Sequence, residues 1–346
     1  MRLKSIVRCL PLMACALVPL ASVVAAHGAG PYGVIDTWKI GGTGGWDYLT
    51  ADPTNHLLYV THGTQLEVID TATGKVVNSI TGFKGLHGVA LDSSGKFGYI
   101  SDGGSNAVVV FDRSTFAKVT SIAAGMNPDG ILFEPATQTV WAFNGRSSDA
   151  TVIDAATQKV VATIKLSGKP EFPQADGNGT VFVNIETKNS IVRLDAKTLA
   201  QTAEWPLKGC ESPSGMAMDT EHRRLYSVCD GKVMTAMDAD SGKMLKLIPI
   251  GDGPDAAGYD AKNQLAFSSN GDGTLTVVNT KNDAFDVVQT LATQKSGRTM
   301  SFDTATGRIY VVAAEMGPRP AATAENPRPR PPVVPGSFTV LVVGRK

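Results

Sequence analysis

Ionisable side chains recur along this chain at intervals of about forty residues, each near the start of a short apolar segment. Aligning the segments places seven residues at equivalent positions, here called the ring residues: Asp47, His87, Asp129, Glu171, Ser214, Asp255 and Arg298. If the segments surround one axis, four carboxylates, a histidine and an arginine converge there. Like charges a few ångströms apart raise each other's pKa or recruit a cation. The pattern predicts a charged central site, in which Asp47 rests on the least regular alignment.

A second set of polar residues lies at the ends of the following apolar segments. Its members are His62, Asp102, Asn144, Glu186, Asn270 and Glu315. We expect a central ligand to be bound by side chains of both sets. The expected ligand-binding residues are Asp47, Asp129, Asn144, Glu186, Asp255, Asn270 and Glu315.

A divalent metal is the one candidate cofactor. Asp129, Glu171 and Asp255 would supply oxygen ligands, which hard divalent cations prefer, and the amide oxygen of Asn144 or Asn270 would complete the set. A carboxylate after proline, as in Pro128-Asp129, also serves simply to cap a turn by hydrogen-bonding nearby backbone. The sequence leaves both roles open.

Proton transfer is the alternative chemistry for the same ring. His87 and Glu171 would move protons on a small acid or lactone, and Arg298 would hold its carboxylate. The chain contains no His-Glu-x-x-His, Gly-x-Ser-x-Gly or Cys-x-x-Cys-His motif. We therefore expect binding without turnover first, and lactone hydrolysis as the enzymatic alternative.

The elements that must position these residues repeat with the same period. Each repeat contains four short strand signals bounded by Gly, Asp, Asn or Pro. The repeats begin near residues 46, 86, 128, 170, 213, 254 and 297. This period predicts an all-β, seven-bladed β-propeller of four-stranded antiparallel blades. The first strand of each blade lines the central channel, which would bring the ring residues to one mouth.

The seventh repeat ends before its fourth strand. Residues 33–40 match that strand and are expected to complete the last blade beside residues 338–343, which closes the ring and removes an exposed edge. Residues 317–336 form a Pro-rich, Arg-bearing insertion that favours polyproline II or disorder. The insertion is either a solvated loop or a lid over the mouth.

Two cysteines, Cys210 and Cys229, lie outside the N-terminal segment. An even pair in an exported protein predicts a disulfide. Closing a loop of this length stabilises the fold by about 3 kcal/mol in the chain-entropy model. The alternative is a soft copper site formed with nearby methionines and His222.

Residues 1–26 are predicted to be a cleaved signal peptide, because three basic residues precede a short apolar run and small residues. The run is too short to span a membrane. Its removal takes three basic residues from a chain with 32 basic and 32 acidic ones, leaving a net charge of about −3. No basic stripe remains to bind nucleic acid. We expect a periplasmic or secreted monomer over residues 27–346, with a lipoprotein form as the alternative.

The run Leu58-Tyr59-Val60-Thr61-His62, followed by Val68-Ile69-Asp70 and Thr73-Gly74-Lys75, resembles the YVTN repeat. The whole chain from residue 33 resembles the exported, seven-bladed YncE-like propellers. The resemblance implies the fold but not an activity, because such propellers serve binding, scaffolding and hydrolysis. We first expect a module that binds a small molecule or a protein partner at a polar, acidic mouth. A lactonase-like hydrolase and a cell-envelope scaffold are the alternatives.

Overall fold

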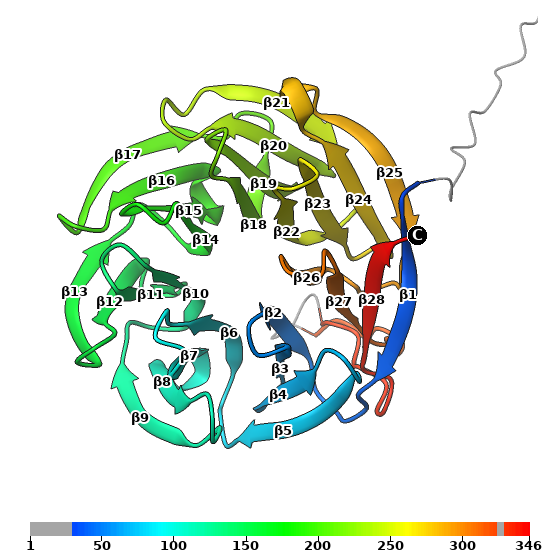
Figure 1. The fold of residues 1–346 in the computed structure, drawn as a ribbon, viewed down its shortest axis with the longest axis horizontal. Helices are drawn as coiled ribbons and strands as arrows, with labels where there is room; N and C mark the ends of the chain where they lie inside the picture. The colour runs from blue at the N-terminus through cyan, green and yellow to red at the C-terminus, as the bar shows by residue number, and fades with distance from the viewer. Residues whose placement is uncertain (1–29, 324–328) are drawn as a thin grey trace, which may run out of the picture.

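The computed structural model describes residues 30–323 and 329–346, and these form seven four-stranded antiparallel sheets around a central axis (Figure 1). The predicted all-β, seven-bladed propeller is therefore confirmed. The predicted signal peptide, residues 1–26, lies outside the described residues. Among the residues that are described, no helix is long and apolar enough to cross a membrane.

Blades 1 to 4 follow the chain in order, each from the axis outward. Blade 1 consists of β2 (Trp46–Asp52), β3 (Leu57–His62), β4 (Gln65–Asp70) and β5 (Lys75–Thr81). Blade 2 consists of β6 (Leu86–Leu91), β7 (Phe97–Asp102), β8 (Ala107–Asp112) and β9 (Lys118–Ala123). Blade 3 consists of β10 (Pro128–Glu134), β11 (Thr139–Asn144), β12 (Asp149–Asp154) and β13 (Lys159–Lys165). Blade 4 consists of β14 (Pro170–Ala175), β15 (Thr180–Ile185), β16 (Ser190–Asp195) and β17 (Ala200–Pro206).

Blades 5 and 6 repeat this order, and blade 7 takes a strand from each end of the chain. Blade 5 consists of β18 (Glu211–Asp219), β19 (Arg224–Asp230), β20 (Val233–Asp238) and β21 (Met244–Pro249). Blade 6 consists of β22 (Pro254–Asp260), β23 (Leu265–Asn270), β24 (Thr274–Asn279) and β25 (Asp286–Ala292). Blade 7 consists of β26 (Thr299–Phe302), β27 (Ile309–Ala313), β28 (Thr339–Arg345) and β1 (Tyr32–Lys39). Short 3₁₀ turns are η1 (Gly103–Ser105), η2 (Glu186–Lys188) and η3 (Lys281–Asp283).

The second strand of each blade forms the middle of the hydrophobic core. Its aromatic residues, such as Tyr59, Tyr99 and Trp141, are fully buried, because both faces of the sheet pack against neighbouring blades. Tyr59 of blade 1, for example, lies in one cluster with Val109 and Phe111 of blade 2. Fourth strands such as β13 are exposed along most of their length, as expected at the outer rim.

Closure of the ring depends on β1, which pairs antiparallel with β28 at the outer edge of blade 7 (Figure 1). The predicted closure by the N-terminal strand is confirmed. Trp38 of β1 packs with Tyr310 and Phe338 of blade 7 and with Trp46 of blade 1 in one buried cluster. The strand therefore joins the last blade to the first.

Two further features bear on the mouth. Cys210, just before β18, forms a disulfide with Cys229 of β19, with a Cα–Cα distance of 5.4 Å. Both sulfurs are used in this bond, so neither is available for the copper site.

The Pro-rich insertion, whose residues 324–328 lie outside the description, is joined to the propeller by backbone contacts. A β-bridge pairs Met316 with Val333, and Gly336 N–H donates to Gly42 O at 2.8 Å.

A chain that begins at Thr43 lacks β1 and loses the buried Tyr32 and Trp38. We expect its melting temperature to fall by roughly 10 °C or more, because each lost aromatic costs several kcal/mol, and the exposed edge of β28 to promote association. Differential scanning calorimetry and light scattering measure both effects. A chain that begins at Gly30 is the control, and equal melting temperatures would contradict this closure.

Candidate functional site

A recurrent backbone irregularity positions the ring residues. In blades 1 to 6 the register between first and second strand shifts immediately after the opening residue of the first strand, as between Pro128 and Ile131 in blade 3. Such a bulge releases one or two residues from the ladder and turns their side chains. Asp47, His87 and Asp129 each lie in such a bulge. The bulge thus places successive ring residues at one mouth.

Buried side chains of the second strands bind the backbone groups that the bulges release. Ser101 Oγ of blade 2 accepts from Gly88 N–H at 2.8 Å and donates to Asp129 O of blade 3 at 2.6 Å. Asn184 of blade 4 donates to Ser214 O of blade 5 at 2.9 Å, and Ser269 of blade 6 donates to Arg298 O of blade 7 at 2.5 Å. These inter-blade hydrogen bonds fix the ring residues relative to one another.

All seven ring residues and Glu186 line one cavity of about 410 Å³, here called the mouth cavity. Seven further residues line it: Tyr48, Lys169, Ser212, Asp230, Gly253, Pro254 and Arg330. Six of the lining side chains are carboxylates, and His87, Lys169, Arg298 and Arg330 are the basic ones. The mouth cavity is therefore polar and mixed in charge, with acids in excess.

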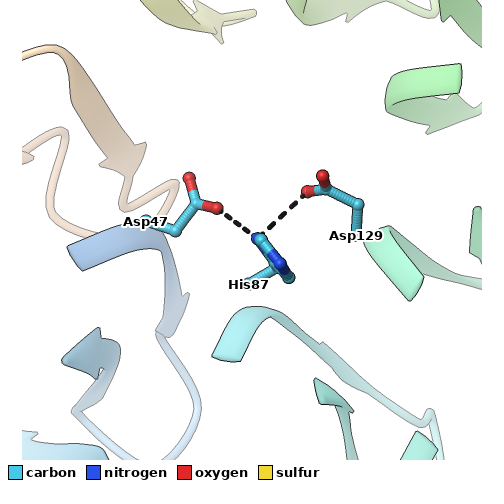
Figure 2. Close-up of side chains that lie close together, drawn as sticks. All are labelled: Asp47, His87 and Asp129. Carbon is cyan, nitrogen blue, oxygen red and sulfur yellow. Dashed lines mark hydrogen bonds and ion pairs between the residues drawn. The ribbon is translucent and has the colours of Figure 1, made fainter. Parts of the chain in front are cut away.

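His87 lies between two carboxylates on neighbouring blades (Figure 2). Its Nδ1 is 2.6 Å from Asp47 Oδ2 and 3.5 Å from Asp129 Oδ1. Burial disfavours the charged imidazole, but the hydrogen bond to Asp47 and the charges of Asp129, Asp47 and Glu171 outweigh it and raise the pKa of His87 to about 9. At neutral pH His87 is therefore protonated.

The pKa values of the Asp129 and Glu171 carboxyl groups are strongly raised. Burial, assisted by the charge of Asp47, raises the pKa of Asp129 to about 7. Burial and the charge of Asp129 raise the pKa of Glu171 to about 8, although the ammonium group of Lys169 opposes this. Lys169 Nζ lies 2.5 Å from both Glu171 Oε1 and Glu186 Oε2. Asp129 and Glu171 therefore retain protons near neutral pH.

On the opposite side, Arg298 Nε donates to Asp255 Oδ2 at 2.6 Å. Burial raises the pKa of Asp255, and the charges of Arg298 and Arg330 counteract the effect. Nη2 of Arg298 makes a long contact of 3.5 Å with Trp46 O, and Nη1 makes no hydrogen bond to any described residue. The guanidinium group thus keeps donors free beside the cavity.

Tyr48 contributes a hydroxyl that the protein leaves without a partner. The side chain is only 5% exposed, and its ring packs edge-on against Phe172 with centroids 4.9 Å apart. Burial, followed by the charges of Asp255 and Glu171, raises the pKa of Tyr48 well above its ordinary range. The hydroxyl is a permanent donor in the mouth cavity, and among the described residues it has no acceptor.

Three predicted ligand-binding residues lie outside the mouth cavity, which corrects the sequence analysis. Asn144 is fully buried, and its Nδ2 donates to Asp149 Oδ1 and Thr151 Oγ1. Asn270 Nδ2 donates to Thr274 Oγ1 and Thr276 Oγ1 in the same manner. Both amides stabilise the hairpin between second and third strands instead of facing the axis. Glu315 is exposed beyond the end of β27.

The remaining members of the second set divide in the same way. Only Glu186 reaches the mouth cavity. His62 is buried against Phe338, with ring centroids 4.1 Å apart, and Asp102 accepts the backbone N–H groups of Lys84 and Gly85. Residues at the ends of the second strands therefore serve mainly the fold.

The metal ligands predicted from sequence do not form a set. Glu171 is paired with Lys169 and Asp255 with Arg298, so neither is free beside Asp129. The described residues bring together a different trio, Asp47, His87 and Asp129, with one ligand atom each within 4.8 Å of the others (Figure 2). Two oxygens and an imidazole nitrogen suit a borderline divalent ion better than a hard one.

Seven residues of the mouth cavity were not predicted as site residues, and three of these, Tyr48, Lys169 and Arg330, bear on its chemistry. Tyr48 follows Asp47 directly, and the bulge brings both residues to the cavity, so adjacency to a ring residue was the available signal. Lys169 precedes the opening proline of blade 4. Arg330 belongs to the Pro-rich insertion, and its place in the cavity follows from the tertiary path of that segment alone.

Comparison with known proteins supports the fold. No protein-family model matches the chain, and no curated protein matches its sequence. The chain is similar to a solved structure of hydrazine synthase from Kuenenia stuttgartiensis, with a TM-score of 0.70 and 14% sequence identity over 85% of this chain and 96% of that one. This similarity shows a shared propeller fold. The narrower resemblance to YVTN-repeat, YncE-like propellers stays a prediction.

Substituting Ser101→Ala removes the side chain that joins the bulges of blades 2 and 3. We expect the free energy of unfolding to fall by about 2 kcal/mol, because Gly88 N–H and Asp129 O lose a buried partner. Urea denaturation measures this change. Ser105→Ala, at an exposed position in η1, is the matched control, and equal losses in both variants would contradict the role of Ser101.

Glu171→Gln should change how stability depends on pH. Between pH 4.5 and 8 the folded protein keeps a proton on Glu171 that the unfolded chain has released, so stability falls as pH rises. The glutamine variant lacks this loss and should gain roughly 4 kcal/mol relative to wild type between pH 5 and pH 9. Denaturant titrations across this range measure the difference. Glu221→Gln, at an exposed turn, should show no such gain; a pH-independent difference for Glu171→Gln would refute the assignment.

Proposed function

We propose that this protein is a binding module that holds a small polar molecule in the mouth cavity. The observation that carries the proposal is a pair of polar groups that line this cavity without a close partner among the described residues. Tyr48 has no acceptor among the described residues, and Asp129 has only the distant contact to His87 at 3.5 Å. A donor and an acceptor that line one polar cavity without close partners favour an occupant that supplies both.

The size and charge of the mouth cavity narrow the class of ligand. A volume of about 410 Å³ is at the small end of ligand pockets. Its lining combines acids such as Asp129 and Glu171 with the guanidinium groups of Arg298 and Arg330. A compact molecule with polar groups at both ends fits this distribution better than a wholly apolar one.

The electrostatics favour binding over lactone hydrolysis. A general base must be unprotonated at the working pH. Because the pKa of His87 is raised to about 9 and that of Glu171 to about 8, both hold protons at pH 7. Arg298 is also engaged by Asp255 and is not free to grip a substrate with its whole guanidinium group. The three residues therefore form a charged binding surface better than a hydrolytic site.

We further propose export to the periplasm or the medium, by way of residues 1–26. The Cys210–Cys229 disulfide supports this location, because such bonds persist in oxidising compartments. A propeller used as a cell-envelope scaffold would bind through its rim, and the mouth cavity would then have no ligand.

A thermal-shift screen of the EDTA-treated mature protein tests the proposal. The panel consists of amino acids, polyamines, short carboxylic acids, and calcium, manganese and zinc ions. A ligand at a hundredfold excess over its Kd adds about 2.7 kcal/mol, which should raise the melting temperature by roughly 5 °C. Tyr48→Phe and Asp129→Asn should abolish the rise.

Glu315→Gln is the matched control, because this acid lies outside the mouth cavity. A rise that survives Tyr48→Phe and Asp129→Asn but disappears in Glu315→Gln would place the ligand elsewhere. No rise with any member of the panel would favour the scaffold alternative. A response to zinc or manganese alone, lost in Asp129→Asn, would identify the ligand as a cation beside His87.

A further inference from the structure

A second cavity, of about 440 Å³, adjoins the mouth cavity beneath the Pro-rich segment. Trp46 and Met316 line it together with residues 331–333, which are Pro, Pro and Val. Arg298 and Arg330 line both cavities and therefore mark the junction between them. The polar mouth thus continues into a mostly apolar space.

The segment that covers the second cavity is held by backbone contacts. Gly317 N–H donates to Pro332 O at 2.8 Å, beside the bridge between Met316 and Val333. The hydrogen bond from Gly336 to Gly42 anchors the end of the segment to the connector before blade 1. Proline at positions 331 and 332 further limits the backbone. The apolar wall is therefore attached on both sides of the cavity.

The junction between the two cavities carries positive charge that is only partly neutralised by ion pairs. Arg330 makes no hydrogen bond or ion pair to any described residue, and its charge acts on Asp255 from across the cavity. Arg298 shares Asp255 as its single close acidic partner. Both guanidinium groups therefore act on Asp255, and the charge of Asp47 also reaches Arg298. The guanidinium carbon of Arg298 lies 5.9 Å from the centroid of the Trp46 ring, within the range of a cation–π interaction.

We propose that the two cavities together bind an organic anion with an apolar body. Its carboxylate, or an equivalent anionic group, contacts Arg298 and Arg330 at the junction, since guanidinium groups bind such groups by charge-assisted hydrogen bonds. Its body fills the second cavity against Trp46 and Pro332. This inference rests on the proposed function and extends its site into the second cavity. It specifies that the ligand carries a negative charge at one end and an apolar group at the other.

Isothermal titration calorimetry with three probes tests the inference on the mature protein. Phenylacetate has both the anionic group and the apolar body, acetate lacks the body, and phenylacetamide lacks the charge. Phenylacetate should bind at least about tenfold more tightly than either of the others. Arg330→Gln should weaken phenylacetate by about tenfold, because it removes one charged donor.

The control is Arg146→Gln, the same substitution at an exposed position that lines neither cavity. It should leave phenylacetate binding unchanged. Arg330 has no partner among the described residues, so Arg330→Gln should melt as wild type does. Equal affinity for phenylacetate and acetate, equal affinity for phenylacetate and phenylacetamide, or no binding of phenylacetate would each overturn the inference. If phenylacetate fails in one of these ways but another ligand of the thermal-shift panel still binds and requires Tyr48, the proposed function stands and only this inference is wrong.

Discussion

The hydrogen bonds from second strands to bulges are the constraint on which the rest of this structure depends. A propeller blade needs its first strand at the axis, where seven backbones crowd together and the regular ladder is interrupted. Each interruption releases backbone groups that water cannot reach easily, and Ser101 and Asn184 satisfy such groups from the neighbouring blade. Ser269 makes the equivalent bond to Arg298 O just before β26. One set of hydrogen bonds thus satisfies the released backbone groups, fixes the position of adjacent blades relative to each other and positions the ring residues.

The hydrogen bonds that position the ring residues do not depend on the side chains of those residues. The inter-blade hydrogen bonds end on backbone atoms, such as Asp129 O and Arg298 O, so the side chain at each bulge contributes nothing to them. The same position can carry an acid in one blade, an imidazole in the next and an arginine in another without loss of the frame. Burial and the charge of Asp129 raise the pKa of Glu171, whereas the carboxylates that the frame holds close to His87 outweigh burial and raise the pKa of His87.

The sequence predicts the fold and the ring well because both depend on local periodicity. A repeat of forty residues places Asp129 and Glu171 at equivalent positions without knowledge of any contact. The second set fails for a related reason: an asparagine such as Asn144 at the end of a strand is equally able to face the axis or the hairpin, and its partners decide. Arg330 is beyond prediction, since a proline-rich segment has no period and its position follows from contacts such as that of Gly336 with Gly42.

The pairing of charges around the mouth cavity shows which groups remain for a ligand. His87 lies between two carboxylates, Lys169 between two others, and Arg298 beside Asp255. A ligand that displaced the carboxylate from any of these cations would have to break an ion pair already desolvated by the protein, and would gain little. Nη1 of Arg298, which makes no hydrogen bond to a described residue, is open to a ligand without such a loss. Among the described residues lining the cavity, Arg330 and the Tyr48 hydroxyl have no such commitment. A ligand therefore gains most free energy by contacting these two donors. The groups that the protein leaves unpaired, more than its excess of acids, determine how a ligand is oriented in the cavity.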